Sequence, residues 1–192
     1  MRLHETVELE RLITTLKKAA ATLRDADVPF AVGGGLAAWA RGGPEVDHDV
    51  DLFVPPRFAE RAAAALADAG MRVERPPEEW LLKAHDGGAT VDVIFAPSGV
   101  RVDEALLERA DEVQVQAMTM PVAALEDVLV SKLLALNEQE LELAGPLEIA
   151  RSLREQINWE EVWHRTEDSP FAAAFRTLVE KLGIVQRDMK DG

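Results

Sequence analysis

The order of apolar and polar residues in the first 118 positions predicts amphipathic helices alternating with short strands. Apolar residues recur every third or fourth position up to Asp25, which predicts a long helix from about Thr6 to Asp25. Short apolar runs that end at glycine or proline predict strands. Further helices are expected at 36–40, 56–68 and 103–110, and strands at 28–32, 49–54, 71–74, 80–84, 90–95 and 113–118.

From Pro121 onward the pattern is that of helices alone. Apolar residues between Val128 and Leu136 line one expected helix, and Gly145-Pro146 is expected to break it from the next, which runs to about Ile157. Two more helices are expected at 159–164 and 171–182. The predicted fold class is α/β (α+β), with a small mixed sheet flanked by helices in residues 1–120 and a helical segment in residues 121–192.

Composition excludes several classes of function. The chain has no cysteine, so disulfides, thiol catalysis and cysteine-bound zinc are excluded. It lacks an apolar run long enough to cross a membrane, and its first residues do not resemble a signal peptide, so we expect a cytoplasmic protein without a membrane partner. The net charge of −14 disfavours broad nonspecific binding to nucleic acid.

Three aspartates and a glycine turn form the strongest candidate for chemistry. The run VGGG (32–35) precedes Asp49-Val50-Asp51 by thirteen residues, and Asp92 follows within the apolar run VDVIF. Glycines such as Gly34 and Gly35 let backbone N–H groups approach phosphate without obstruction by a Cβ atom. Asp49 and Asp51 leave the same face of a strand and suit Mg²⁺, and Asp92 on a neighbouring strand would complete a two-metal site and activate an acceptor hydroxyl.

This arrangement resembles the signature of the nucleotidyltransferase superfamily, in which a glycine pair precedes Asp-x-Asp and a third acidic residue follows on a later strand. Residues 120–143, 150–162 and 169–184 are similar to small bacterial nucleotidyltransferases related to abortive-infection and MenT-type toxins. The resemblance implies a Mg²⁺-dependent enzyme that moves a nucleoside monophosphate from a nucleoside triphosphate to a hydroxyl. It also implies that the helical segment completes the active site.

The resemblance assigns two further residues to triphosphate binding. Lys132 stands where the family has a lysine on a helix after the sheet, and Glu142 is the nearest match to an acidic residue that follows this lysine. Lys132 is also the sole charge in an apolar helix stretch, where a lysine needs an anion or access to solvent. Arg41 lies between the glycines and the carboxylates and is a candidate contact for phosphate or ribose. An ordinary surface arginine without a ligand is an equally good interpretation.

Three functions remain open from the sequence. The first is a toxin-like enzyme that modifies tRNA and has a cognate antitoxin as a partner. The second is an enzyme that modifies a small molecule, as antibiotic-modifying members of the superfamily do. The third is a catalytically silent binding module with the same fold. All three aspartates are present, which counts against the third. The charge favours a small or cationic acceptor, whereas the similarity of the C-terminal half to toxin-type enzymes favours tRNA, which is the leading hypothesis from the sequence.

Overall fold

The computed structural model describes residues 2–44 and 49–186, and its centre is a seven-stranded mixed sheet. The strand order is β3-β4-β5-β2-β1-β7-β6, in which β2–β5 and β1–β7 are parallel and the other neighbours are antiparallel. The strands are β1 (Ala31–Val32), β2 (Asp49–Phe53), β3 (Arg72–Glu74), β4 (Leu81–Asp86), β5 (Ala89–Ile94), β6 (Asp111–Val115) and β7 (Met118–Val122). The predicted mixed sheet flanked by helices is therefore confirmed.

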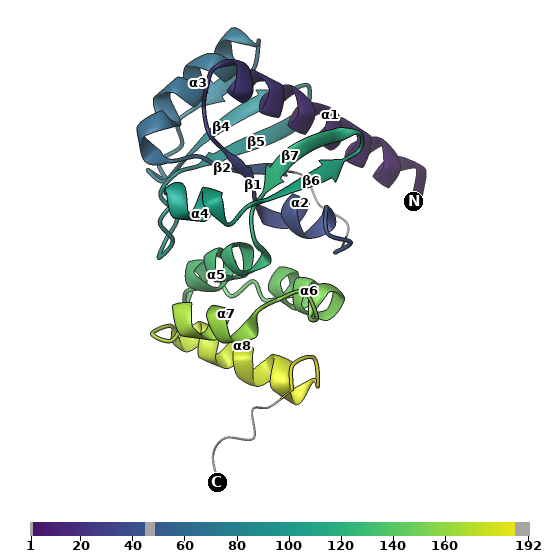
Figure 1. Ribbon diagram of the computed structural model, residues 1–192, viewed down its shortest axis with the longest axis vertical. Coiled ribbons are helices and arrows are strands. Elements are labelled where there is room, and N and C mark those ends of the chain that lie inside the picture. The colour runs from purple at the N-terminus through teal and green to yellow at the C-terminus, as the bar shows by residue number, and fades with distance from the viewer. Residues whose placement is uncertain (1, 45–48, 187–192) are drawn as a thin grey trace.

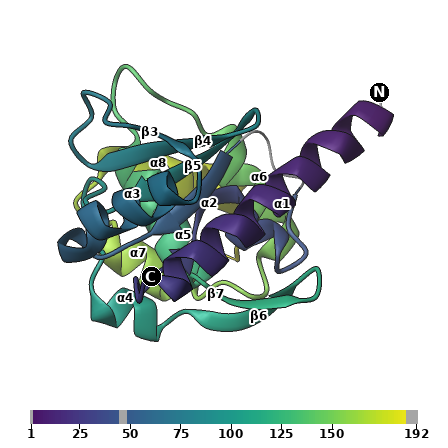
Figure 2. The same cartoon turned by 90° about the horizontal axis from the view of Figure 1, so that it is seen from above.

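Helices cover both sides of this sheet (Figure 1). Two of them, α1 and α3, pack above it, and α1 crosses β2 and β5 with its first turns extending past the body in Figure 2. The later helices stack below the sheet. The bounds are α1 (Arg2–Asp25), α2 (Gly34–Trp39), η1 (Pro56–Phe58), α3 (Ala59–Asp68), α4 (Glu104–Glu108), α5 (Leu125–Ala135), α6 (Ala144–Leu153), α7 (Trp159–Arg165) and α8 (Pro170–Lys181).

Strand alternation separates an apolar face of β2 and β5 from a polar one. Val50, Leu52, Val91 and Val93 are at most 1% exposed, as expected for the face that α1 covers. The residues between them along each strand point to the opposite face, toward the side where α5 lies. The core thus fixes which side of the sheet carries the aspartates.

Two sequence predictions were wrong. Residues 113–118 do not form one strand, because β6 and β7 make a hairpin whose turn residues Gln116 and Ala117 have φ of 42° and 68°. The chain is consequently still in a strand at Pro121, where helices alone had been expected.

No helix in the described residues is long and apolar enough to span a membrane.

The expected break at Gly145-Pro146 was also wrong, because both residues lie in the first turn of α6. The chain leaves α5 at Ala135 instead, and residues 136–143 connect the two helices. A proline is tolerated in a first helical turn because the N–H that it lacks would have no partner within the helix.

Candidate active site

The glycine turn after β1 places its backbone directly against Asp51. Gly33 N–H donates to the Asp51 carbonyl at 2.8 Å, and Gly34 has φ of +53°, a conformation that favours glycine. A Cβ atom on Gly34 would lie 1.6 Å from Asp51 Oδ2. Only glycine at position 34 therefore leaves the space that the Asp51 carboxylate occupies. Helix α2 begins at Gly34, two residues before the predicted start.

The parallel pairing of β2 and β5 brings the three aspartates together. Asp51 lies opposite Asp92 in the register, and Asp49 lies opposite Thr90. Because side chains two residues apart share a face, all three aspartates leave the same side of the sheet. Asp92 is only 9% exposed.

Asp51 is the carboxylate that this environment perturbs most clearly. Its pKa rises to about 6, mainly because burial disfavours the charged form. Lys132 opposes this rise in pKa, whereas the negative charges of Asp92 and Asp49 add to it. A cation bound here would relieve the same desolvation and repulsion.

Lys132 approaches the aspartates from α5, below the sheet. It lies in the last turn of that helix, and its charge lowers the pKa of Asp51 more than any other neighbouring charge. The fold therefore brings together the four residues predicted to be catalytic: Asp49, Asp51, Asp92 and Lys132. Their chemical roles remain predictions.

Comparison with known proteins identifies the family. The chain matches the family model "Nucleotidyl transferase of unknown function (DUF2204)" over residues 12–170. The chain belongs to this family. This nucleotidyl transferase is accordingly an enzyme, and its fold is shared by solved nucleotidyltransferases. No curated protein matches it in sequence.

Three solved structures illustrate the shared fold. The solution structure of the antibiotic-resistance factor ANT(2'')-Ia is 19% identical, with a TM-score of 0.64 over 92% of this chain and 96% of that one. The crystal structure of ANT(2'')-Ia with adenylyl-2''-tobramycin is 18% identical, with a TM-score of 0.55 over 86% and 97%. A Thermotoga maritima protein assigned as a nucleotidyltransferase is 20% identical, with a TM-score of 0.54 over 78% and 94%.

Sequence reasoning missed one charged residue of this nucleotidyl transferase, Lys83 on β4. Its Nζ donates to Asp92 Oδ1 at 3.0 Å and to Oδ2 at 2.8 Å. The signal was in the Gly87-Gly88 turn, where positive φ angles of +55° and +97° give a two-residue hairpin turn. Such a turn fixes the register of β4 against β5 and places Lys83 opposite Asp92.

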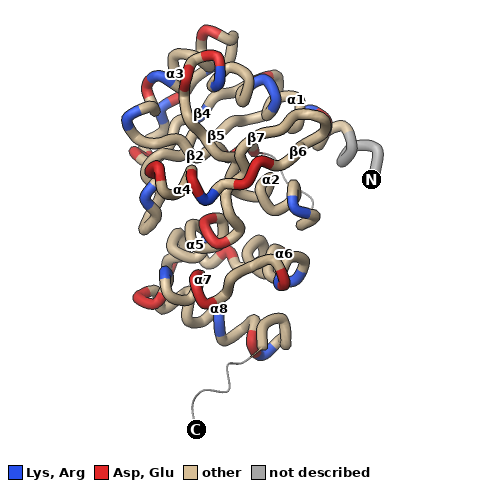
Figure 3. The backbone as a smooth tube through the Cα atoms, in the orientation of Figure 1, with Lys and Arg blue, Asp and Glu red and all other residues tan. Residues whose placement is uncertain are grey.

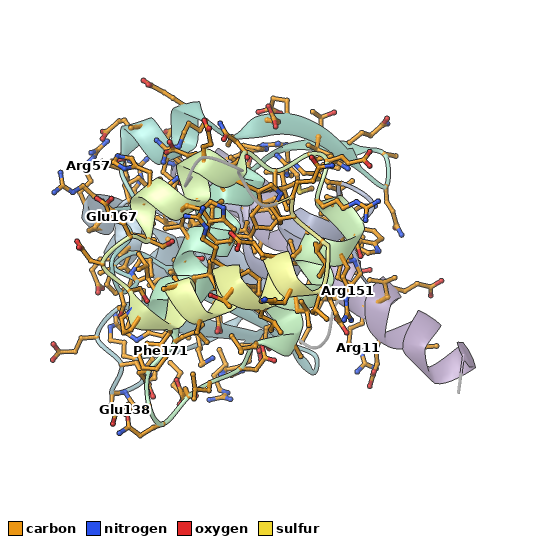
Figure 4. All side chains as sticks on the ribbon, turned by 90° about the horizontal axis from the view of Figure 1, so that it is seen from below. Arg11, Arg57, Glu138, Arg151, Glu167 and Phe171 are labelled. Atoms are coloured by element: carbon orange, nitrogen blue, oxygen red, sulfur yellow. The ribbon has the colours of Figure 1, made fainter. Side chains whose placement is uncertain are left out.

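The two remaining predicted binding residues of the enzyme have partners elsewhere in the fold. Arg41 Nη2 donates to Asp111 Oδ2 at 2.9 Å and to the Val122 carbonyl at 3.1 Å, which ties the end of α2 to the β6–β7 hairpin. Glu142 Oε1 accepts the Ala144 N–H at 2.7 Å at the start of α6. Glu142 belongs to the exposed α5–α6 connection, from which Glu138 projects at the periphery in Figure 4.

The donor set fits Mg²⁺ best at Asp49 and Asp51. Both supply hard carboxylate oxygens from one strand face, and the missing Cβ at Gly34 lets the Asp51 carboxylate lie directly against the glycine turn. Within residues 2–44 and 49–186, no three His, Cys, Asp or Glu side chains are grouped so as to hold one ion. Asp92 instead has both oxygens engaged by Lys83.

Proposed function

We propose that this enzyme transfers a nucleoside monophosphate from a Mg²⁺-bound nucleoside triphosphate to a hydroxyl group of an acceptor. The observation that carries the proposal is the register of β2 and β5, which sets Asp92 beside Asp51 on the face that Asp49 also shares. A carboxylate pair for the metal and a third carboxylate for the proton are then within one site. Mg²⁺ held by Asp49 and Asp51 would supply charge neutralisation of the triphosphate.

The transfer itself is a substitution at the α-phosphorus. The acceptor hydroxyl loses its proton to the Asp92 carboxylate, and its oxygen forms the new bond to phosphorus. The bond between the α-phosphorus and the bridging oxygen breaks, and pyrophosphate leaves with that electron pair. Lys132 lies within electrostatic reach of Asp51 and is placed to offset negative charge on the phosphates.

We infer a small cationic molecule as the acceptor. A net charge of −14 attracts cations and repels a long polyanion. Lys and Arg positions alternate with Asp and Glu positions along the backbone in Figure 3. ANT(2'')-Ia, which shares the fold, was crystallised with an adenylylated tobramycin.

The second candidate acceptor is tRNA. It is favoured by the similarity of residues 120–143, 150–162 and 169–184 to toxin-type nucleotidyltransferases, and under it a cognate antitoxin is the expected partner. Extensive tRNA binding would require a local basic surface to overcome the acidic field of the chain. A binding module without catalysis is the third candidate.

A labelling experiment separates these candidates. The enzyme is incubated with each α-³²P-labelled nucleoside triphosphate, Mg²⁺, and either a panel of aminoglycosides and polyamino alcohols or total tRNA. We expect label on a small cationic acceptor and none from γ-³²P donors, because the γ-phosphate leaves in pyrophosphate. Asp92→Asn and Asp49→Asn are the inactive controls, and Asp168→Asn, an exposed carboxylate far along the chain, is the active one. Label on tRNA alone would select the second candidate, and no transfer would refute the proposal.

A further inference from the structure

Lys83 lies on the polar face of the sheet, on β4, the second strand from one edge. The β4–β5 register sets it opposite Asp92, and the β3–β4 register sets it opposite Glu74. Its backbone position is therefore fixed from both sides by paired strands. Its side chain therefore has an acidic residue on each neighbouring strand, Glu74 on β3 and Asp92 on β5.

The ammonium group is bonded to the aspartate of the active site. Both oxygens of Asp92 accept from Lys83 Nζ, at 3.0 and 2.8 Å. Glu74 is engaged elsewhere, with Oε2 lying 3.2 Å from His85 Nε2 and 3.4 Å from Arg72 Nη1. Lys83 thus contributes its charge to the catalytic carboxylates rather than to the outer edge of the sheet.

The three aspartates also stabilise the charged form of Lys83. Burial acts to lower the pKa of Lys83, but the hydrogen bond and the charge of Asp92, followed by the charges of Asp49 and Asp51, outweigh burial and raise it. The side chain is 31% exposed, so it is screened from bulk solvent without being sealed off. An ammonium at this point is a permanent positive charge beside the carboxylates.

We propose that the Lys83 ammonium takes the place of a second metal ion, so that the active site binds one divalent cation, at Asp49 and Asp51. In the described part of the chain no three acidic side chains are grouped around one ion, which agrees with Asp92 being committed to Lys83. One divalent ion and one ammonium together balance three carboxylates. The inference rests on the proposed nucleotidyl transfer and specifies the cation content of the same site.

This arrangement gives Lys83 a role in the reaction through Asp92. The salt bridge holds the carboxylate in one orientation, with lone pairs left to accept the proton of the acceptor hydroxyl. Once Asp92 is protonated, the positive charge of Lys83 is free to offset the negative charge that develops on the transferring phosphoryl group. Lys83 is a positioning residue for Asp92 in this scheme.

Counting bound Mn²⁺ by electron paramagnetic resonance tests the proposal on the full chain without turnover. The metal-free protein is titrated with Mn²⁺ alone, as wild type, Lys83→Met, Lys83→Gln and Lys83→Arg, after far-UV circular dichroism has established folding. We expect one ion per chain in the wild type and in Lys83→Arg. We expect two ions, or at least tenfold tighter Mn²⁺ binding, in the two variants that lack the charge.

Each alternative count overturns the inference. Two ions in the wild type would show that Lys83 does not occupy a cation position. An unchanged count and affinity in both Lys83→Met and Lys83→Gln would show that its charge does not exclude an ion. No binding to the wild type would remove the Asp49/Asp51 metal site as well. The proposed transfer is judged separately by the α-³²P assay, so one ion with no transfer would refute the function and leave the cation count standing.

Discussion

Replacing Asp51 with asparagine should stabilise the metal-free enzyme while abolishing transfer. Asn has nearly the shape of a protonated aspartate, and it has no charge to desolvate. The pKa of Asp51 is raised from 3.8 to about 6 by burial and by the negative charges of Asp92 and Asp49, against the attraction of Lys132. At about 1.36 kcal/mol per pH unit, ionising this group costs the folded state about 3 kcal/mol above pH 6.

The sign of the pH dependence follows from the direction of the pKa shift. Between pH 4 and pH 6 the folded state keeps a proton on Asp51 that the unfolded chain has lost, so the free energy of unfolding falls as pH rises through this window. Below pH 4 the carboxyl group is protonated in both the folded and the unfolded state, so the free energy of unfolding carries no penalty from ionising Asp51. Asp51→Asn has no carboxyl group to ionise at this position, so its free energy of unfolding should exceed that of the wild type by up to about 3 kcal/mol at pH 8.

Urea denaturation at pH 4, 5, 6 and 8 in the presence of EDTA measures this effect. Asp168→Asn, at an exposed position in the turn before α8, is the matched control and should follow the wild type at every pH. Mg²⁺ should recover stability in the wild type and leave Asp51→Asn unchanged, because the variant has lost a ligand. An equal difference in unfolding free energy between Asp51→Asn and the wild type at every pH from 4 to 8 would contradict the raised pKa of Asp51.

Three further substitutions test other parts of the site. Gly34→Ala places a Cβ atom against the Asp51 carboxylate at positive φ. It should lower the free energy of unfolding by about 1–2 kcal/mol in urea denaturation and the transfer rate at least tenfold. Transfer kinetics equal to those of the wild type would contradict this prediction. Asp127→Ala removes the buried carboxylate that Arg109 and Arg165 share and should cost about 1–3 kcal/mol of unfolding free energy, because both arginines keep access to solvent. No measurable loss in urea denaturation would contradict this. Lys132→Ala should weaken nucleotide binding or transfer by about 1–3 kcal/mol in steady-state kinetics with little change in melting temperature, and unchanged kinetics would remove its role.

The shared face of Asp49 and Asp51 could be predicted from the sequence because strand alternation is a local property. The position of Asp92 beside Asp51 could not be derived in this way, because it depends on the parallel pairing of β2 with β5 across about forty residues of chain. That position came from the resemblance to a family. Lys83 could have been found locally, since the glycine turn after β4 determines its partner.

The β6–β7 hairpin escaped prediction for a different physical reason. Its turn is made by Gln116 and Ala117, which rarely adopt positive φ, so the sequence carries no glycine or asparagine to mark it. Pro121 was predicted to begin the helical part of the chain, yet it lies within β7 opposite Glu112. Tertiary pairing with β6, and with β1 at Val32–Val122, overrides the local signal there.

An ion cluster around the buried carboxylate of Asp127 lies at the start of the helix that carries Lys132. Asp127 is 0% exposed and accepts hydrogen bonds from Arg109 at 3.0 and 2.8 Å and from Arg165 at 2.7 Å. These arginines follow α4 and end α7, so one carboxylate ties α5 to elements before and after it. Such clusters add little net stability compared with apolar packing, but they disfavour every arrangement in which a charge loses its partners. The sheet aligns the aspartates, while Asp127 links α5, the helix that carries Lys132, to Arg109 and Arg165, so the four site residues come together only when α5 is packed against the sheet.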